Sequence, residues 1–152
     1  MTLEEKAGLC SGLDFWHLKG MERSGVPSIM VSDGPRGLCK QREEGDHLGI
    51  NDSIKAVCFP PAVLSACSFD TELMDALGDV IGCEAQATDV AVVLGPGVNI
   101  KRSPICGRNF EYFSEDPFLA GELSVSFIKG VQRYHVGTSI KHFAATTRRR
   151  GE

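Results

Sequence analysis

Four polar side chains lie in three segments of the chain, and their types suit a ligand rich in hydroxyl groups. Asp33 follows an apolar run at residues 28–31 and offers a carboxylate that accepts hydrogen bonds. Arg108, in the loop GRNFEYFSEDP, offers a planar fork of donors. Lys141 and His142 add donors near the end of the chain. A sugar ring fits this mixture better than a nucleotide, which would need a phosphate cradle.

The same residues also have purely structural interpretations. Asp33 precedes a Gly-Pro pair and is typical of a turn. Arg108 can pair with Glu111 or Glu115 and so stiffen its own loop. The aromatic side chains of this loop can form either an apolar wall for a ligand or part of the core: Phe110, Tyr112 and Phe113.

Hydrophobic spacing predicts the elements that must position these residues. A capping-box pattern at Thr2 predicts a short helix that ends near Cys10. Apolar residues at helical spacing predict two longer helices, over residues 71–85 and 120–131. Short apolar runs predict four strands, at residues 28–31, 62–66, 89–94 and 141–143, the last entered through residues 137–140.

Strands that alternate with helices are typical of an α/β fold with a parallel sheet. Polar, glycine-rich segments follow the strands, where barrels and open sheets place their binding sites. Residues 38–57 form a long polar excursion, and such loops are uncommon unless functional. Gly95-x-Gly97 lacks the third glycine of a Rossmann fingerprint. With no Walker loop and no metal-binding histidine pair in the sequence, we expect no cofactor and no metal.

Composition narrows the class of protein. A chain of 152 residues, 42% hydrophobic and 24% charged, fits one globular domain. Its net charge of −4 argues against nucleic acid as a partner. No apolar stretch approaches the roughly 20 residues of a membrane span, and the N-terminus lacks the apolar region of a secretion signal. The six cysteines include no C-x-x-C pair, so we expect reduced thiols in a cytoplasmic protein rather than disulfides or zinc.

Five segments, in order along the chain, resemble the family 3 glycoside hydrolases and in particular bacterial β-glucosidases. They are TLEEKAGLCSG, PSIMVSDGPRGL, FPPAVLSACSFD, LGPGVNIKRSPICGRNFEYFSEDPFLAGE and VGTSIKHFAA. The resemblance implies that residues 1–145 are the N-terminal half of a (β/α)₈ barrel with parallel strands, because a whole barrel takes about 250 residues.

The resemblance also implies a substrate and residue roles. Family members hydrolyse terminal non-reducing β-D-glucosyl residues with retention, so the expected partner is a β-glucoside or an oligosaccharide. Asp33, Arg108, Lys141 and His142 match the family residues that hold this sugar. Successive strand residues point to opposite faces, so we expect a distorted backbone at Lys141-His142, and the resemblance suggests a cis peptide. SDGPRG and GRNFEYFSEDP resemble the glucosidase branch more than β-xylosidases or N-acetylglucosaminidases.

The resemblance places both catalytic carboxyl groups beyond residue 152. We therefore expect no catalytic residue within this chain and no hydrolysis by the chain alone. A half barrel exposes strand edges, which favours aggregation or self-association. The alternative function is that of a non-catalytic carbohydrate-binding remnant.

The last residues depart from the family pattern. Where the family has Asn-Asn-Gln-Glu, this chain has Thr146-Thr147-Arg148-Arg149, which is what those codons encode when read one base late. We interpret residues 146–152 as an aberrant, frameshifted tail. On this interpretation the arginines are not a nucleic-acid patch.

Overall fold

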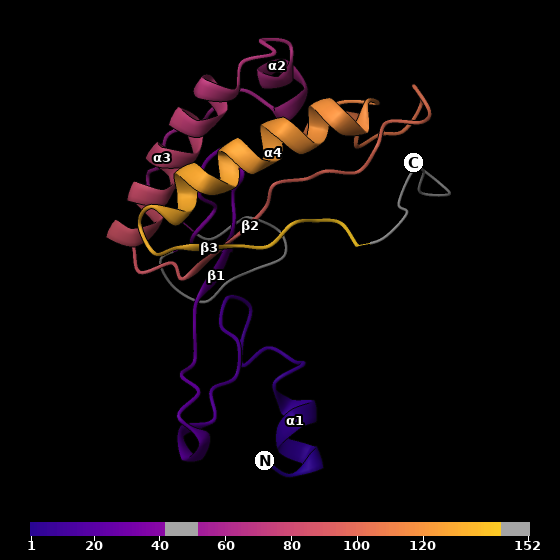
Figure 1. Cartoon of the computed structure of the whole chain (residues 1–152). Coiled ribbons are helices and arrows are strands. Elements are labelled where there is room, and N and C mark those ends of the chain that lie inside the picture. The colour runs from indigo at the N-terminus through magenta and orange to yellow at the C-terminus, as the bar shows by residue number, and fades with distance from the viewer. Residues whose placement is uncertain (42–51, 144–152) are drawn as a thin grey trace.

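The computed structural model describes residues 1–41 and 52–143, and at its centre is a parallel three-stranded sheet (Figure 1). In the register of the sheet, Val31 lies beside Val92, and Val92 lies beside Gly137. The carboxyl ends of the strands therefore meet at one edge, and the parallel α/β arrangement expected from the sequence is confirmed. The strands, in their order across the sheet, are β1 (Val31–Asp33), β2 (Val92–Leu94) and β3 (Gly137–Thr138).

Two long helices form the layer above this sheet (Figure 1). α3 (Thr71–Ala87) precedes β2, and α4 (Pro117–Gln132) connects β2 to β3. The side chains of Asp70 and Asp116 accept hydrogen bonds from backbone N–H groups of the first turn of α3 and α4, respectively. Both helices were predicted from their apolar spacing, and both predictions are confirmed.

The hydrophobic core lies between the sheet and these helices. Val93 in β2, Ile81 in α3 and Leu123 in α4 are each 0% exposed. The helices approach each other closely at glycines: a Cβ atom on Gly130 would lie 2.3 Å from the carbonyl oxygen of Asp75. This close approach leaves no room for a side chain at Gly130 between α3 and α4.

The strand predicted at residues 62–66 is wrong, because this segment is the short helix α2 (Ala62–Ala66). Pro61 precedes its first turn with extended backbone, a position that suits proline. Ser65 and Ala66 are buried while Leu64 is 58% exposed, so one side of the turn packs inward. A short apolar run cannot be assigned to strand or helix by periodicity alone.

The other strand boundaries are shifted from their predicted positions. β1 begins at the last residue of the predicted run 28–31, while Met30 forms an isolated antiparallel bridge with His17. β3 occupies the segment that was expected only to lead into a strand, and Lys141 retains a single parallel bridge with Gly97. The described part of the chain therefore contains three strands rather than the predicted four.

Two predicted segments are described only in part or not at all. Of the polar excursion at residues 38–57, residues 42–51 lie outside the described residues, and its two ends meet at a bridge between Gln41 and Ser53. The tail at residues 146–152 also lies outside the described residues, so its frameshift origin stays a prediction.

The N-terminal residues form an arm that extends away from the sheet (Figure 1). It carries α1 (Leu3–Gly8), which begins with the predicted capping box at Thr2, and the short 3-10 helix η1 (Glu22–Ser24). Arg23 and Glu5 form an ion pair of 2.6 Å that joins these two turns. α1 contains no buried residue. The side chains of α1 therefore add nothing to the core, whereas Trp16, which follows α1, packs partly buried against it.

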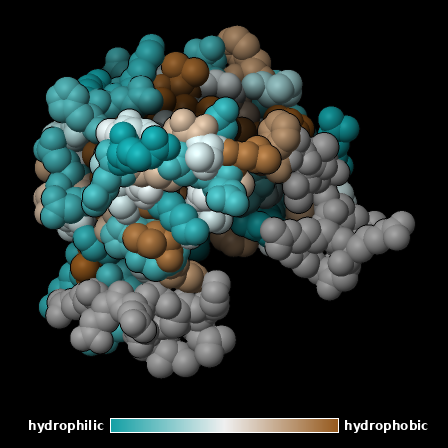
Figure 2. Space-filling view, turned by 90° about the horizontal axis from the view of Figure 1, so that it is seen from below, coloured by the Kyte–Doolittle hydropathy of each residue, from teal (hydrophilic) through white to brown (hydrophobic). Residues whose placement is uncertain are grey.

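Apolar side chains remain exposed near the open side of the sheet. Phe143 is fully exposed and Ile140 is 55% exposed, and both follow β3. Figure 2 shows hydrophobic residues (brown) interspersed with hydrophilic ones (teal) on the face seen from below. Within residues 1–41 and 52–143, β1 and β3 pair only with β2, and no helix is long and apolar enough to cross a membrane. Self-association through these edges stays a prediction.

The close approach of α3 and α4 can be tested with two glycines on the same helix. Gly130→Ala should lower the free energy of unfolding by about 1–3 kcal/mol, because its methyl group would meet backbone atoms of α3. Gly121→Ala is the matched control: no atom lies within 4 Å of the added Cβ, so the higher helix propensity of alanine should stabilise by up to about 1 kcal/mol. Urea denaturation followed by circular dichroism measures both, and equal shifts in the two variants would contradict this packing.

Candidate functional site

Three segments that follow the three strands line a cavity of about 270 Å³, and the rest of its lining comes from residues 59–65 and from α3 and α4. Asp33 comes from the end of β1, Arg108 from the long loop after β2, and Lys141 from the segment after β3. All three line this cavity, together with the aromatic side chains of Phe110 and Phe113. The ring of His142 lies next to these residues, in contact with the guanidinium of Arg108. The structure thus brings together all four polar residues predicted for the site.

Asp33 and Lys141 form an ion pair between the end of β1 and the segment that follows β3. The Nζ atom of Lys141 lies 2.5 Å from Oδ1 of Asp33, and the lysine side chain is only 18% exposed. Oδ1 also accepts a hydrogen bond of 3.0 Å from the backbone N–H of Gly34. Asp33 is therefore both a turn residue and a cavity residue. Its side chain is 52% exposed, which leaves the carboxylate accessible to a ligand.

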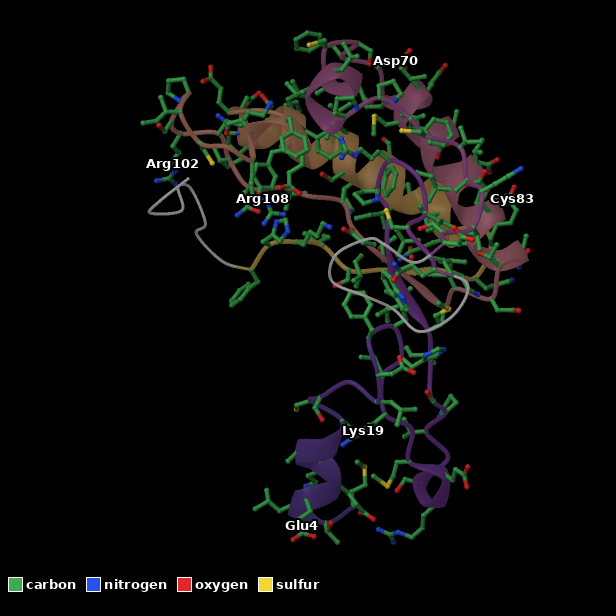
Figure 3. All side chains as sticks on the ribbon, turned by 180° about the vertical axis from the view of Figure 1, so that it is seen from behind. Glu4, Lys19, Asp70, Cys83, Arg102 and Arg108 are labelled. Carbon is green, nitrogen blue, oxygen red and sulfur yellow. The ribbon has the colours of Figure 1, made fainter. Side chains whose placement is uncertain are left out.

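Arg108 is held on two sides. Its Nε atom and one Nη atom donate to the two carboxylate oxygens of Glu111. Its Nη2 atom also lies 3.0 Å from Nε2 of His142. Figure 3 shows Arg108 reaching from its loop towards the chain that follows β3. The structural interpretation of this arginine is confirmed, because the ion pair with Glu111 holds the guanidinium at the cavity wall, while its contact with a sugar stays a prediction.

His142 is contacted at its ring and at its backbone. Its Nδ1 atom lies 3.1 Å from the hydroxyl oxygen of Tyr112. The backbone N–H of His142 donates to Oδ1 of Asn99 at 2.7 Å, and the amide nitrogen of Asn99 donates to the backbone carbonyl of His142 at 3.2 Å. The peptide bond between Lys141 and His142 is cis. The predicted departure from regular strand geometry at this pair is confirmed.

The aromatic residues of the loop divide between wall and core. Phe110 is 45% exposed at the cavity, with the guanidinium of Arg36 5.3 Å from its ring centre. Phe113 is 5% exposed and lines the cavity from the core side, whereas Tyr112 is 2% exposed and contacts His142. Lys101 secures this loop by donating to the backbone carbonyl of Phe113 at 3.1 Å, and burial lowers the pKa of its ammonium group.

Two side chains of the site were not singled out from the sequence. Asn99 follows β2 in the run GVNIKR, and Arg36 lies in SDGPRG. Both are polar residues in segments that follow strands, and that position was the only sequence signal that could have identified them. Nothing in the spacing indicates that Asn99 would meet the backbone of a residue so far along the chain.

Among the described residues, two carboxylates line the cavity, and both have cationic partners. Asp33 pairs with Lys141, and Glu111 pairs with Arg108. No group of three or more histidine, cysteine or acidic side chains that could hold a metal occurs in the described ranges. A cavity with paired charges and aromatic walls can bind a neutral, hydroxylated ring by hydrogen bonds and by contact with its C–H surface.

All six cysteines carry free thiols. Cys39 lies near the site, where burial and the nearby carboxylate of Asp33 raise the pKa of its thiol. A raised pKa disfavours the thiolate, which is the nucleophilic form of cysteine. Location in the cytoplasm, expected from the cysteine pattern, stays a prediction.

Comparison with known proteins identifies relatives of this chain. The family described as "Glycosyl hydrolase family 3 N terminal domain" matches residues 41–151. The "Thermostable beta-glucosidase B" of Acetivibrio thermocellus is 63% identical over 145 residues, covering 95% of this chain and 19% of that protein. The "Exo-alpha-(1->6)-L-arabinopyranosidase" of Bifidobacterium longum is 51% identical over 146 residues, with the same coverage of 95% and 19%. The chain thus spans about a fifth of the length of these curated relatives.

Solved structures of β-glucosidases are also similar to this chain. A family 3 β-glucosidase from Bifidobacterium adolescentis matches with a TM-score of 0.82 and 49% identity, over 97% of this chain and 20% of that one. A β-glucosidase from Kluyveromyces marxianus, solved in complex with glucose, matches with a TM-score of 0.85 and 38% identity, over 97% and 17%. These likenesses confirm the expected fold, which is part of a (β/α)₈ barrel. The chain belongs to glycosyl hydrolase family 3, and it matches the N-terminal part of proteins of that family.

Proposed function

We propose that the protein to which this chain belongs is a β-glucosidase that hydrolyses terminal non-reducing β-D-glucosyl residues with retention. Within it, Asp33, Arg108, Lys141 and His142 hold the terminal sugar. One observation carries this proposal: Asp33, Arg108 and Lys141, from three different strand ends, line one cavity, and His142 contacts Arg108 there.

The cavity has the groups that a pyranose requires. The carboxylate of Asp33 accepts hydrogen bonds from hydroxyl groups, and the Lys141 ammonium and Arg108 guanidinium donate to hydroxyl oxygens. Charge-assisted hydrogen bonds of this kind are stronger than neutral ones. Phe110 and Phe113 provide an apolar surface at the same cavity for the C–H groups of the ring.

We propose that this chain contributes sugar binding rather than bond cleavage. Retaining hydrolysis needs two carboxyl groups about 5–5.5 Å apart that flank the glycosidic bond, one as nucleophile and one as acid/base. Asp33 and Glu111, the carboxylates that line the cavity, each form a salt bridge. Such pairing suits a role in binding and support, and the family resemblance implies that the catalytic carboxyl groups lie in other parts of the protein.

A second function rests on the same cavity. The four polar residues would equally serve a carbohydrate-binding protein without hydrolytic activity, which is the alternative function stated from the sequence. The sugar itself also has a rival candidate, because a relative 51% identical is named for α-L-arabinopyranose rather than glucose. Glucose is preferred because the relative with 63% identity is named a β-glucosidase.

Glucose binding tests the role of Asp33. In the chain of residues 1–152, Asp33→Asn should raise the Kd for glucose about 10- to 100-fold, because hydrogen bonds to a charged group contribute about 1.5–3 kcal/mol. Isothermal titration calorimetry measures this change. The control is Asp14→Asn on the N-terminal arm, where the new side chain keeps an oxygen acceptor for the turn at Trp16. Equal glucose affinity in Asp33→Asn and in the wild type would contradict the proposed sugar contact.

Hydrolysis tests the division of roles. The chain of residues 1–152 should bind glucose yet release no product from an aryl β-glucoside, because the proposed catalytic carboxyl groups are supplied by other residues. Chromogenic assay of this chain beside the intact parent protein makes the measurement, and only the parent should turn over. If the chain alone were active, and if that activity survived Asp33→Ala but vanished in Glu111→Gln, the chemistry would lie at Glu111 instead.

Open sheet edges lead to a further expectation for the isolated chain. β1 and β3 each carry an outer edge with no partner strand in the described residues, and Phe143 and Ile140 are exposed nearby. We expect the chain of residues 1–152 to form dimers or larger species at micromolar concentration. Analytical ultracentrifugation gives the distribution of species. A monomer throughout that range would exclude association through these edges.

A further inference from the structure

The imidazole of His142 has a different neighbour at each nitrogen. Nε2 lies 3.0 Å from Nη2 of Arg108, and Nδ1 lies 3.1 Å from the hydroxyl oxygen of Tyr112. A guanidinium group has five N–H donors and no acceptor. Nε2 must therefore accept, and a nitrogen that accepts carries no proton. The neutral ring then has its proton on Nδ1 and donates it to the oxygen of Tyr112.

Tyr112 is well placed to fix this choice. Its side chain is 2% exposed, and its ring stands nearly perpendicular to that of His142, at 82° with the ring centres 5.9 Å apart. Burial prevents the tyrosine from swinging away into solvent. Because its oxygen can accept the Nδ1–H, Tyr112 favours the tautomer that leaves Nε2 for Arg108.

Asn99 holds the backbone of the same histidine. Its amide group pairs with both the N–H and the carbonyl of His142, at 2.7 and 3.2 Å. This double contact fixes the position of the backbone, while Tyr112 fixes the ring. Asn99 and Tyr112 come from either end of the loop after β2, so that one loop supports His142 at two points.

We infer that Tyr112 and Asn99 are positioning residues for the sugar-binding cavity, and that they hold His142 as the neutral tautomer protonated on Nδ1. In this state His142 accepts from Arg108 and, together with Glu111, keeps the guanidinium at the cavity wall. This inference rests on the proposed function for its effect on sugar affinity, but the tautomer itself does not depend on any ligand.

A pH dependence follows from this geometry. If acid added a proton to Nε2, the imidazole of His142 would become a cation with an N–H donor at that nitrogen. Its hydrogen bond with Arg108 would then be replaced by a contact between two positively charged donor groups. Among the described residues, the charged groups near the ring are Arg108, Lys141 next to it in the chain, Glu111 across Arg108, and Asp33 across Lys141. Each carboxylate already has a cationic partner. Glucose affinity should therefore be highest where His142 is neutral and should fall as acid protonates it.

The tautomer can be measured directly in the unmodified chain. Nuclear magnetic resonance of isotope-labelled histidine distinguishes a protonated from an unprotonated ring nitrogen, and His142→Gln assigns the signals. At neutral pH and without ligand, we expect His142 to carry its proton on Nδ1 alone. A protonated Nε2, or a mixture of the two tautomers, would overturn the inference whether or not the chain binds sugar.

A matched pair of tyrosine variants tests the positioning role. Tyr112→Phe should introduce the second tautomer of His142 and raise the glucose Kd about three- to tenfold, the worth of one hydrogen bond. Tyr134→Phe is the control, because its hydroxyl contacts Asp79 of α3 rather than His142. An unchanged tautomer and an unchanged Kd in Tyr112→Phe would refute the positioning role.

Two outcomes separate this inference from the proposed function. If the wild-type chain shows the Nδ1 tautomer but no glucose binding at any pH, the proposed sugar site fails while the tautomer stands. If glucose binds to a chain in which Nε2 is protonated, the sugar site stands and the positioning of His142 is wrong. Circular dichroism of each variant establishes that its fold is retained.

Discussion

The ion pair between Asp33 and Lys141 is the contact on which the site depends. It joins residues 108 positions apart in the chain, and it forms because parallel strands place their carboxyl ends at one edge of the sheet. The two flanking strands pair only with β2 within the described residues, so the sheet holds both partners at a fixed separation. The helices α3 and α4 pack closely on each other at Gly78 and Gly130.

Paired charges in this cavity serve both structure and binding. A charged side chain taken partly out of water needs a partner, and Arg108 has Glu111 while Lys141 has Asp33. The pairing holds each head group at the wall of the cavity before any ligand arrives. A ligand then meets donors and acceptors that are already ordered, which reduces the entropy lost on binding. The paired state of both carboxylates also suits them to support rather than to nucleophilic attack.

Hydrophobic periodicity predicted the long helices correctly, but it did not predict the type or the bounds of the short elements. The apolar stripes of α3 and α4 extend over several turns and can be satisfied only by helices. At residues 62–66 the apolar run is one turn long, so the pattern fits a strand as well as a helix, and the contacts of Ser65 and Ala66 with the core decided for α2. The exact bounds of β1 and β3 depend on hydrogen bonds to β2, which no local pattern contains.

The amino-acid sequence by itself determined the fold class, the family and the four polar residues of the cavity, because these are carried by local patterns and by long runs that resemble known relatives. Only the tertiary structure decided which residues support them. Asn99 meets the backbone of His142, and Tyr112 meets its ring, across 43 and 30 positions of sequence. Such contacts arise when the sheet folds the chain back on itself, and two residues that meet in this way share no spacing that a linear pattern could reveal.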